Sequence, residues 1–143
     1  MKIKTPKGVS VTISSKTGGK INAQLKWNPN YQAIWENKFN KAQKYVDTEC
    51  LRLSDKFVPL QYGYLKSSGI IGTKIGSGKL EYLEIYSRYQ YYGKVMIGSA
   101  PKTVTNINLT YNHAPKRGAF WFERMKKIYK EQILNGARRI IKE

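Results

Sequence analysis

The sequence predicts a small α+β domain: two long helices packed on a small antiparallel sheet, an N-terminal β-hairpin, and a long loop before the C-terminal helix. Two long stretches in which apolar residues recur every three or four positions predict the helices, and shorter stretches of strict alternation predict the strands. Clusters of Gly, Asn and Pro separate them. The 143 residues are one domain's worth of protein, so we expect a single domain over 1–143.

The N-terminal segment alternates between apolar and polar residues on both sides of a glycine turn. The apolar positions are Val9, Val11, Ile13, Ile21, Ala23 and Leu25. With the turn at Lys16–Lys20, this pattern predicts a hairpin from about Val9 to Trp27. An isolated two-stranded hairpin is marginally stable in water. We therefore expect residues 1–27 to be an assembly hairpin that needs a neighbour, such as another subunit.

A long apolar stripe predicts the first helix, from about Tyr31 to Phe57. The stripe consists of Trp35, Phe39, Ala42, Val46, Cys50, Leu53 and Phe57. Pro59 should end the helix, because a proline disfavours the helical conformation of the residue before it. Cys50 lies within the stripe, which indicates a small buried apolar side chain rather than a reactive thiol.

The middle of the chain predicts a second hairpin, with strands at about 69–75 and 79–86 joined by the turn Gly76-Ser77-Gly78. The segment Gly93–Gly118 has little periodicity and is rich in Asn and Pro. Long loops in compact domains are usually functional. We interpret this loop as an arm that reaches a neighbour or orders on assembly, with a mobile surface insertion as the alternative.

A second apolar stripe predicts the C-terminal helix, from about Ala119 to Ile141, with Gly136 permitting close packing. The helix opens with Phe120, Trp121 and Phe122. Successive residues on a helix diverge by about 100°, so these three rings cannot all face one core. We expect at least one of them, with Phe120 and Trp121 as the candidates, to contact another subunit.

The charge is strongly unbalanced. Twenty-six Lys and Arg face nine Asp and Glu, which gives a net charge of +17. Such a balance indicates a polyanionic partner (nucleic acid, an acidic membrane or an acidic protein) or else a solubilising surface. Basic residues dominate the polar side of the C-terminal helix, and we take Lys126, Lys127 and Lys130 as candidates for a docking surface.

Candidate catalytic groups are few. His113 is the single histidine and lies in the predicted loop, so a catalytic triad would have to use it. Asp47 and Asp55 are two turns apart on the first helix, where a solvated surface is the expected environment. No phosphate-binding glycine loop, signal peptide or membrane-length apolar run is present in these residues. We expect no enzymatic activity, cofactor or metal, and a cytoplasmic compartment.

Tyrosines gather between Tyr86 and Gly93, including Tyr89, Tyr91 and Tyr92. Tyrosine with interleaved arginine can stack the bases of single-stranded nucleic acid. Tyrosine also anchors protein interfaces. We favour the protein interface and keep the stacking platform as the alternative.

Two blocks of sequence resemble proteins of the tailed-bacteriophage tail-completion family. In the first, Phe57–Gly69, a helix ends at a proline, and a turn glycine, a leucine, a basic residue and a serine follow. The matching residues are Pro59, Gly63, Leu65, Lys66 and Ser68. Gln61 and Tyr62 replace the usual Asp and Thr. The second block, Tyr86–Gly93, is similar to the family's Tyr-Ala-x-x-x-Glu-x-Gly, with Tyr91 where Glu is common.

The run 88–98 and a third block, 114–126, resemble a narrower group, the "minor capsid protein" family of phages and prophages of Gram-positive bacteria. This resemblance implies a small α+β subunit that assembles as a ring at the head–tail junction of the virion. Its implied partners are copies of itself and neighbouring neck and tail proteins, with packaged DNA passing through the ring. The resemblance implies no membrane partner, and it implies synthesis in the cytoplasm of a host bacterium. Most of the positive charge would then face acidic proteins or solvent, and only a fraction would line the DNA path.

Two other functions remain open at this stage. A basic nucleic-acid-binding module would use the Tyr86–Tyr92 cluster. A toxin-type ribonuclease would cut RNA with Arg, Lys and Tyr and without a metal. Ring formation favours the connector, salt-sensitive binding to short single strands favours the binding module, and RNA cleavage favours the ribonuclease.

Overall fold

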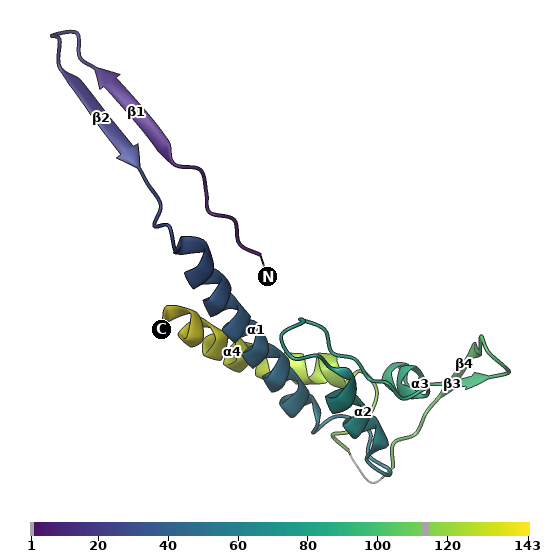
Figure 1. Ribbon diagram of the computed structural model, residues 1–143. Coiled ribbons are helices and arrows are strands. Elements are labelled where there is room, and N and C mark those ends of the chain that lie inside the picture. The colour runs from purple at the N-terminus through teal and green to yellow at the C-terminus, as the bar shows by residue number, and fades with distance from the viewer. Residues whose placement is uncertain (1, 113–114) are drawn as a thin grey trace. The chain divides into compact units, whose positions relative to one another are not determined.

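The computed structural model describes residues 2–112 and 115–143, and within them the fold is mixed α+β with four helices and two antiparallel two-stranded sheets (Figure 1). The predicted fold class is confirmed. The chain consists of two compact units, residues 1–40 and 41–143. His113 lies outside the described residues.

The N-terminal hairpin is present as predicted. Strands β1 (Val9–Ser14) and β2 (Lys20–Leu25) pair antiparallel and reverse at Gly18, whose φ of 90° suits a residue without a side chain. The register places Val9 opposite Leu25 and Ile13 opposite Ile21. Because side chains alternate between the two faces of a strand, one face of this hairpin is wholly apolar and the other polar.

Helix α1 (Tyr31–Ser54) is slightly shorter than predicted. After Ser54, the N–H groups of Phe57 and Val58 both bond to its carbonyl, and both side chains turn into the core. Cys50 is half-buried against that core, and burial raises the pKa of its thiol, with Asp47 and Glu49 adding to the effect. These surroundings fit the prediction that Cys50 serves as a small apolar side chain.

The second predicted hairpin, at 69–75 and 79–86, is wrong. Residues Tyr64–Gly72 form helix α2, which begins after Gly63 at φ 83°. Leu65, Ser68 and Gly69 are buried, at helical spacing. Gly69 lies directly against the ring of Tyr82, so packing selects a helix where the β-branched residues suggested a strand. Residues 79–84 run beside this helix without strand pairing.

The predicted long loop 93–118 contains a hairpin. After the short helix α3 (Ser87–Tyr92), strands β3 (Lys94–Ile97) and β4 (Thr103–Asn108) pair antiparallel with an irregular register. Residues 109–112 and 115–120 are irregular, so the loop before the last helix is shorter than predicted.

Helix α4 (Trp121–Lys142) confirms the predicted C-terminal helix. The core of the 41–143 unit forms between helices and the turn after α1. It consists of Leu53, Phe57, Val58, Leu65, Trp121, Met125 and Ile133. Gly136 lies directly against the ring of Tyr45, so the close packing expected at this glycine joins α4 to α1.

Candidate interaction surfaces

The start of α4 is built into a cluster of aromatic rings. Tyr91 meets Trp121 edge to face at 4.7 Å, and Tyr82 meets it at 5.3 Å. Trp121 is only 2% exposed, so its candidacy as a partner contact is wrong. Trp121 is a core residue because the rings of Tyr82 and Tyr91 pack against it. Tyr91 is half-buried, and it anchors α3 to α4 rather than presenting a free ring.

Tyr92 and Phe120 form the outer part of this cluster. Their ring centres lie 6.0 Å apart. Tyr92 is 49% exposed and Phe120 is 44% exposed. Tyr91 touches both rings from the core side. A rigidly supported, exposed aromatic pair is typical of a protein-interface anchor.

Phe120 also has an unusual backbone. Its φ and ψ of 52° and 41° place it in the left-handed region, which non-glycine residues seldom adopt. Its N–H bonds to the carbonyl of Tyr91 at 2.8 Å. The surrounding contacts thus hold a residue with a strained backbone in place. Such strained residues cluster at functional positions.

Tyr89, the remaining candidate from this segment, is half-buried, and the ammonium of Lys102 lies 5.2 Å from its ring centre. A cation already covers one face of the ring. Base stacking on that face would require Lys102 to move.

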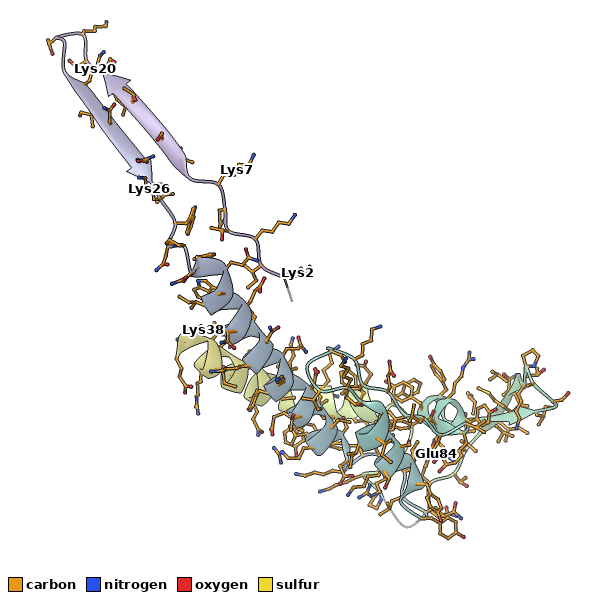
Figure 2. The ribbon with its side chains drawn as sticks, viewed as in Figure 1. Lys2, Lys7, Lys20, Lys26, Lys38 and Glu84 are labelled. Atoms are coloured by element: carbon orange, nitrogen blue, oxygen red, sulfur yellow. The ribbon has the colours of Figure 1, made fainter. Side chains whose placement is uncertain are left out.

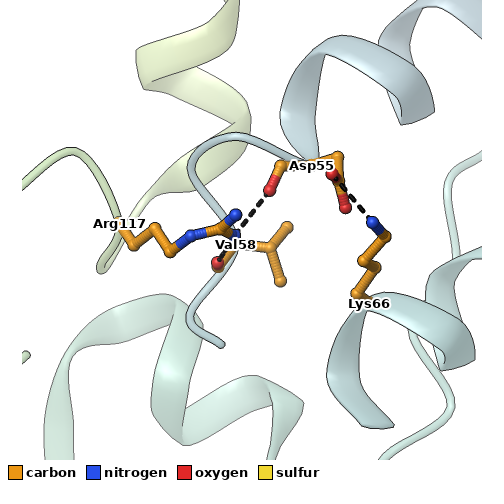
Figure 3. A network of polar contacts seen from close by, with 4 residues as sticks. All are labelled: Asp55, Val58, Lys66 and Arg117. Atoms are coloured by element: carbon orange, nitrogen blue, oxygen red, sulfur yellow. Dashed lines mark hydrogen bonds and ion pairs between the residues drawn. The ribbon is translucent and has the colours of Figure 1, made fainter. Parts of the chain in front are cut away.

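A polar junction holds the end of α1 in position (Figure 3). One guanidinium nitrogen of Arg117 donates to the carbonyls of Asp55 and Val58 at 2.7 and 2.6 Å. Lys66 on α2 forms an ion pair with the Asp55 carboxylate at 3.0 Å. Arg117 therefore caps backbone carbonyls that the end of the helix leaves unpaired.

The three sequence blocks 57–69, 86–93 and 114–126 converge in this unit. Arg117 and Gly118 of the third block bond to the first block at Val58 and Phe57. Phe120 of the third block bonds to Tyr91 of the second. The loop of the first block also lines a groove of about 710 Å³ together with Tyr111 and Arg117. These blocks thus make up a shared structural junction.

The basic face of α4 is exposed. Lys126, Lys127 and Lys130 all lie on the surface, and Lys126 is 3.7 Å from Glu123. With both side chains more than half exposed, that pair stabilises the helix little. The three ammonium groups are therefore accessible to a partner, as the sequence predicts.

Asp47 is not on a solvated surface, and that prediction is wrong. The residue is buried, and its carboxylate accepts hydrogen bonds from the N–H groups of Gly76 and Gly78, at 2.7 and 3.1 Å. Gln43 donates to its other oxygen at 2.7 Å. The carboxylate therefore fixes the turn that leads from α2 into residues 79–86. Asp55, in contrast, is partly exposed, and Lys66 forms an ion pair with its carboxylate.

Within residues 2–112 and 115–143, no three His, Cys, Asp or Glu side chains come together as metal ligands would. In the same described part of the chain, no helix is both long and apolar enough to span a membrane.

Comparison with known proteins gives no relative. No family model, no curated protein and no solved structure matches this chain.

Proposed function

We propose that this chain is a structural subunit of a tailed bacteriophage: a ring-forming connector or tail-completion protein that joins the portal side of the head to the tail. It acts by binding, and its partners are copies of itself and neighbouring neck and tail proteins. The virion's head–tail junction is its proposed location.

One observation supports this proposal above the others. The apolar face of β1–β2 is exposed, with Ile21 68% and Ile13 61% accessible. A two-stranded hairpin is marginal in water, and an exposed apolar sheet face invites association. A subunit that is completed by assembly explains why the chain carries such a face.

Two further features agree with an assembly subunit. The Tyr92–Phe120 pair and the basic face of α4 are exposed on well-supported elements. The three blocks on which the resemblance rests lie at one junction in the 41–143 unit.

The test is electron microscopy of virions labelled with an antibody against this protein. We expect label at the head–tail junction. Label over the whole capsid shell would instead indicate a decoration protein, and virions without label would remove the proposal.

A nucleic-acid-binding module is the second candidate, favoured by the net charge of +17. It predicts binding to short single strands that weakens steeply as salt rises, which fluorescence anisotropy measures. Tyr92→Ala should weaken that binding if the tyrosine cluster stacks bases. Binding that is absent at low salt would exclude this function. RNA cleavage in the same samples would point to the ribonuclease.

A further inference from the structure

The acidic residues are distributed unevenly along the chain. All nine lie within residues 36–84 and 123–143. Residues 1–35 contain six lysines, residues 85–122 contain five Lys and Arg, and neither segment contains Asp or Glu. Each of these two segments carries one hairpin, β1–β2 or β3–β4. A surface that serves solubility alone intersperses charges of both signs, so solubility does not account for this separation.

The lysines of β3–β4 are already engaged within their own unit. Lys94 donates to the side-chain oxygen of Asn108 at 2.6 Å, and the ammonium of Lys102 lies over the ring of Tyr89. The lysines of residues 7–26, in contrast, are exposed and take part in none of the ion pairs found in the part of the chain that the structure describes. The charge of β1–β2 is therefore available to a partner.

One face of β1–β2 adds hydrogen-bonding groups to this charge. Three cross-strand pairs form that face: Ser10 with Gln24, Thr12 with Asn22, and Ser14 with Lys20. Directly opposed side chains of paired strands lie on the same face. We call these six residues the polar face. It consists of hydroxyl, amide and ammonium groups, and it contains no acidic, aliphatic or aromatic residue.

Further lysines lie at both ends of the hairpin. Lys7 and Lys26 lie at its open end, and Lys20 lies near the turn (Figure 2). Lys16 belongs to the turn itself. Each strand has six residues. At about 3.3 Å per residue, the positive charge therefore extends along a ribbon roughly 20 Å long.

The composition of this ribbon restricts the class of partner. Lysine, hydroxyl and amide side chains are the groups with which proteins contact nucleic-acid phosphates. An interface with another protein would be enriched in aromatic residues, Met and Arg, and depleted in Lys and Ser. A membrane-binding face would carry bulky apolar side chains. The major groove of B-DNA also admits a two-stranded β-ribbon. Charge, hydrogen-bonding groups and shape therefore agree on duplex DNA.

We infer that the polar face of β1–β2 docks on duplex DNA, with Lys16, Lys20 and Lys26 neutralising backbone phosphates. A ribbon roughly 20 Å long covers about six base pairs, at 3.4 Å each. Contacts to phosphates carry no sequence information, so this binding is independent of sequence. The inference goes beyond the proposed function, which uses the apolar face for assembly. Side chains of the two faces point in opposite directions, so both faces can be occupied at once.

A salt titration of the full-length protein tests the phosphate contacts. Fluorescence anisotropy measures its binding to a short labelled duplex of mixed sequence over a series of NaCl concentrations. One variant combines Lys16→Gln, Lys20→Gln and Lys26→Gln. Each phosphate contact contributes about 0.9 to the slope of log affinity against log salt, so we expect this slope to fall by about 2–3. At about 0.1 M salt, the affinity should fall at least tenfold.

The matched control removes the same charge from α4, by combining Lys126→Gln, Lys127→Gln and Lys130→Gln. The two triple variants have equal net charge, and all six lysines are exposed. Charges that do not touch the DNA act only through a field that salt screens. We therefore expect the control to change the affinity by less than about threefold and to keep the slope. Circular dichroism verifies that each variant is folded.

Photochemical crosslinking tests which face of the hairpin meets the DNA. All variants carry Cys50→Ser, which removes the natural thiol. Thr12→Cys places a thiol on the polar face, and Val11→Cys places one on the apolar face. Each thiol is labelled with the same photoactivatable aryl azide. Under the same light dose, we expect the Thr12→Cys variant to crosslink to the duplex and the Val11→Cys variant to give little product.

Three results would overturn the inference. The absence of duplex binding at low salt would mean that the hairpin serves another partner. Equal losses from the two lysine variants would mean that net charge alone attracts the DNA. Crosslinks mainly from Val11→Cys would place the DNA on the apolar face. Virion labelling is independent of these results, so duplex binding without label at the junction would refute the proposed function alone.

Discussion

Phe120 combines a left-handed backbone with a half-exposed aromatic ring. An L-residue in this conformation costs roughly 1 kcal/mol, which glycine does not incur. The hydrogen bond to Tyr91 and packing against the rings of Tyr91 and Tyr92 offset that cost. The position therefore exchanges backbone stability for a fixed orientation of the ring.

Because of this strain, the Gly and Ala variants at Phe120 should rank in stability in the reverse of their usual order within a helix. Phe120→Ala and Phe120→Gly both remove the ring, but only glycine removes the strain. We expect Phe120→Gly to be about 1 kcal/mol more stable than Phe120→Ala in urea unfolding. At Gln132, an exposed position within α4, the same comparison should favour alanine by about 1 kcal/mol. Equal stability of the two Phe120 variants would mean that the backbone relaxes at this site.

Asp47 provides a second prediction for a single residue. Its carboxylate accepts two backbone N–H groups from the 76–78 turn. Asp47→Ala should lower the free energy of unfolding by about 2 kcal/mol, since hydrogen bonds to charged groups contribute most. Glu81→Ala removes the same charge from an exposed side chain and should change stability by about 0.5 kcal/mol or less. Equal losses from both variants would show that charge, rather than the turn contact, matters.

Among the elements, the α1–α4 contact depends on the absence of a side chain at Gly136. A Cβ there would collide with the ring of Tyr45. Alanine raises helix propensity by about 1 kcal/mol over glycine, yet overpacking costs more. We expect Gly136→Ala to destabilise the protein by about 2 kcal/mol.

A double-mutant cycle isolates this contact. In a Tyr45→Ala background the collision disappears, so Gly136→Ala should become stabilising. Thermal unfolding of the four proteins measures both signs. Stabilisation by Gly136→Ala in the natural background would mean that α1 and α4 are not packed as closely as the structure has them.

The sequence predicted those elements whose pattern is local. Alternation over 9–25 and helical spacing over 31–57 and 119–141 were sufficient, because each element has one apolar face. Helix α2 was missed because Ile70 and Ile71 favour strands locally, whereas the burial of Leu65 and Gly69 against distant residues decides the structure. The β3–β4 hairpin was missed because Thr103–Asn108 is largely polar.

Long-range contacts explain the outcome for the candidate surfaces. Spacing correctly indicated that the rings at 120–122 diverge, but it could not say which of them is buried. Trp121 is the buried one, because Tyr82 and Tyr91 surround it. Asp47 was missed because its partners are 29 and 31 residues away. The exposed lysines of α4 were predicted because their polar face follows from helical periodicity alone.

For the whole molecule, both units are basic. Residues 1–40 carry seven lysines and one glutamate, so the remaining charge belongs to 41–143. Like-charged subunits repel one another. They can still assemble when acidic groups line the contacts between subunits, or when acidic proteins bind next to the assembly. The proposed connector therefore requires acidic neighbours as well as contacts between its copies.

The basic face of α4 is the surface that we expect to meet such a neighbour. Replacing Lys126, Lys127 and Lys130 together by Glu reverses its charge without touching the core. The new carboxylates repel Glu123, which costs about a few tenths of a kcal/mol per pair. This cost is too small to unfold the subunit. We therefore expect normal circular dichroism but separate heads and tails by electron microscopy, with infectivity lost. Replacing the same three residues by Arg keeps the charge and should preserve joining. Infectious particles from the Glu variant would show that this face does not dock.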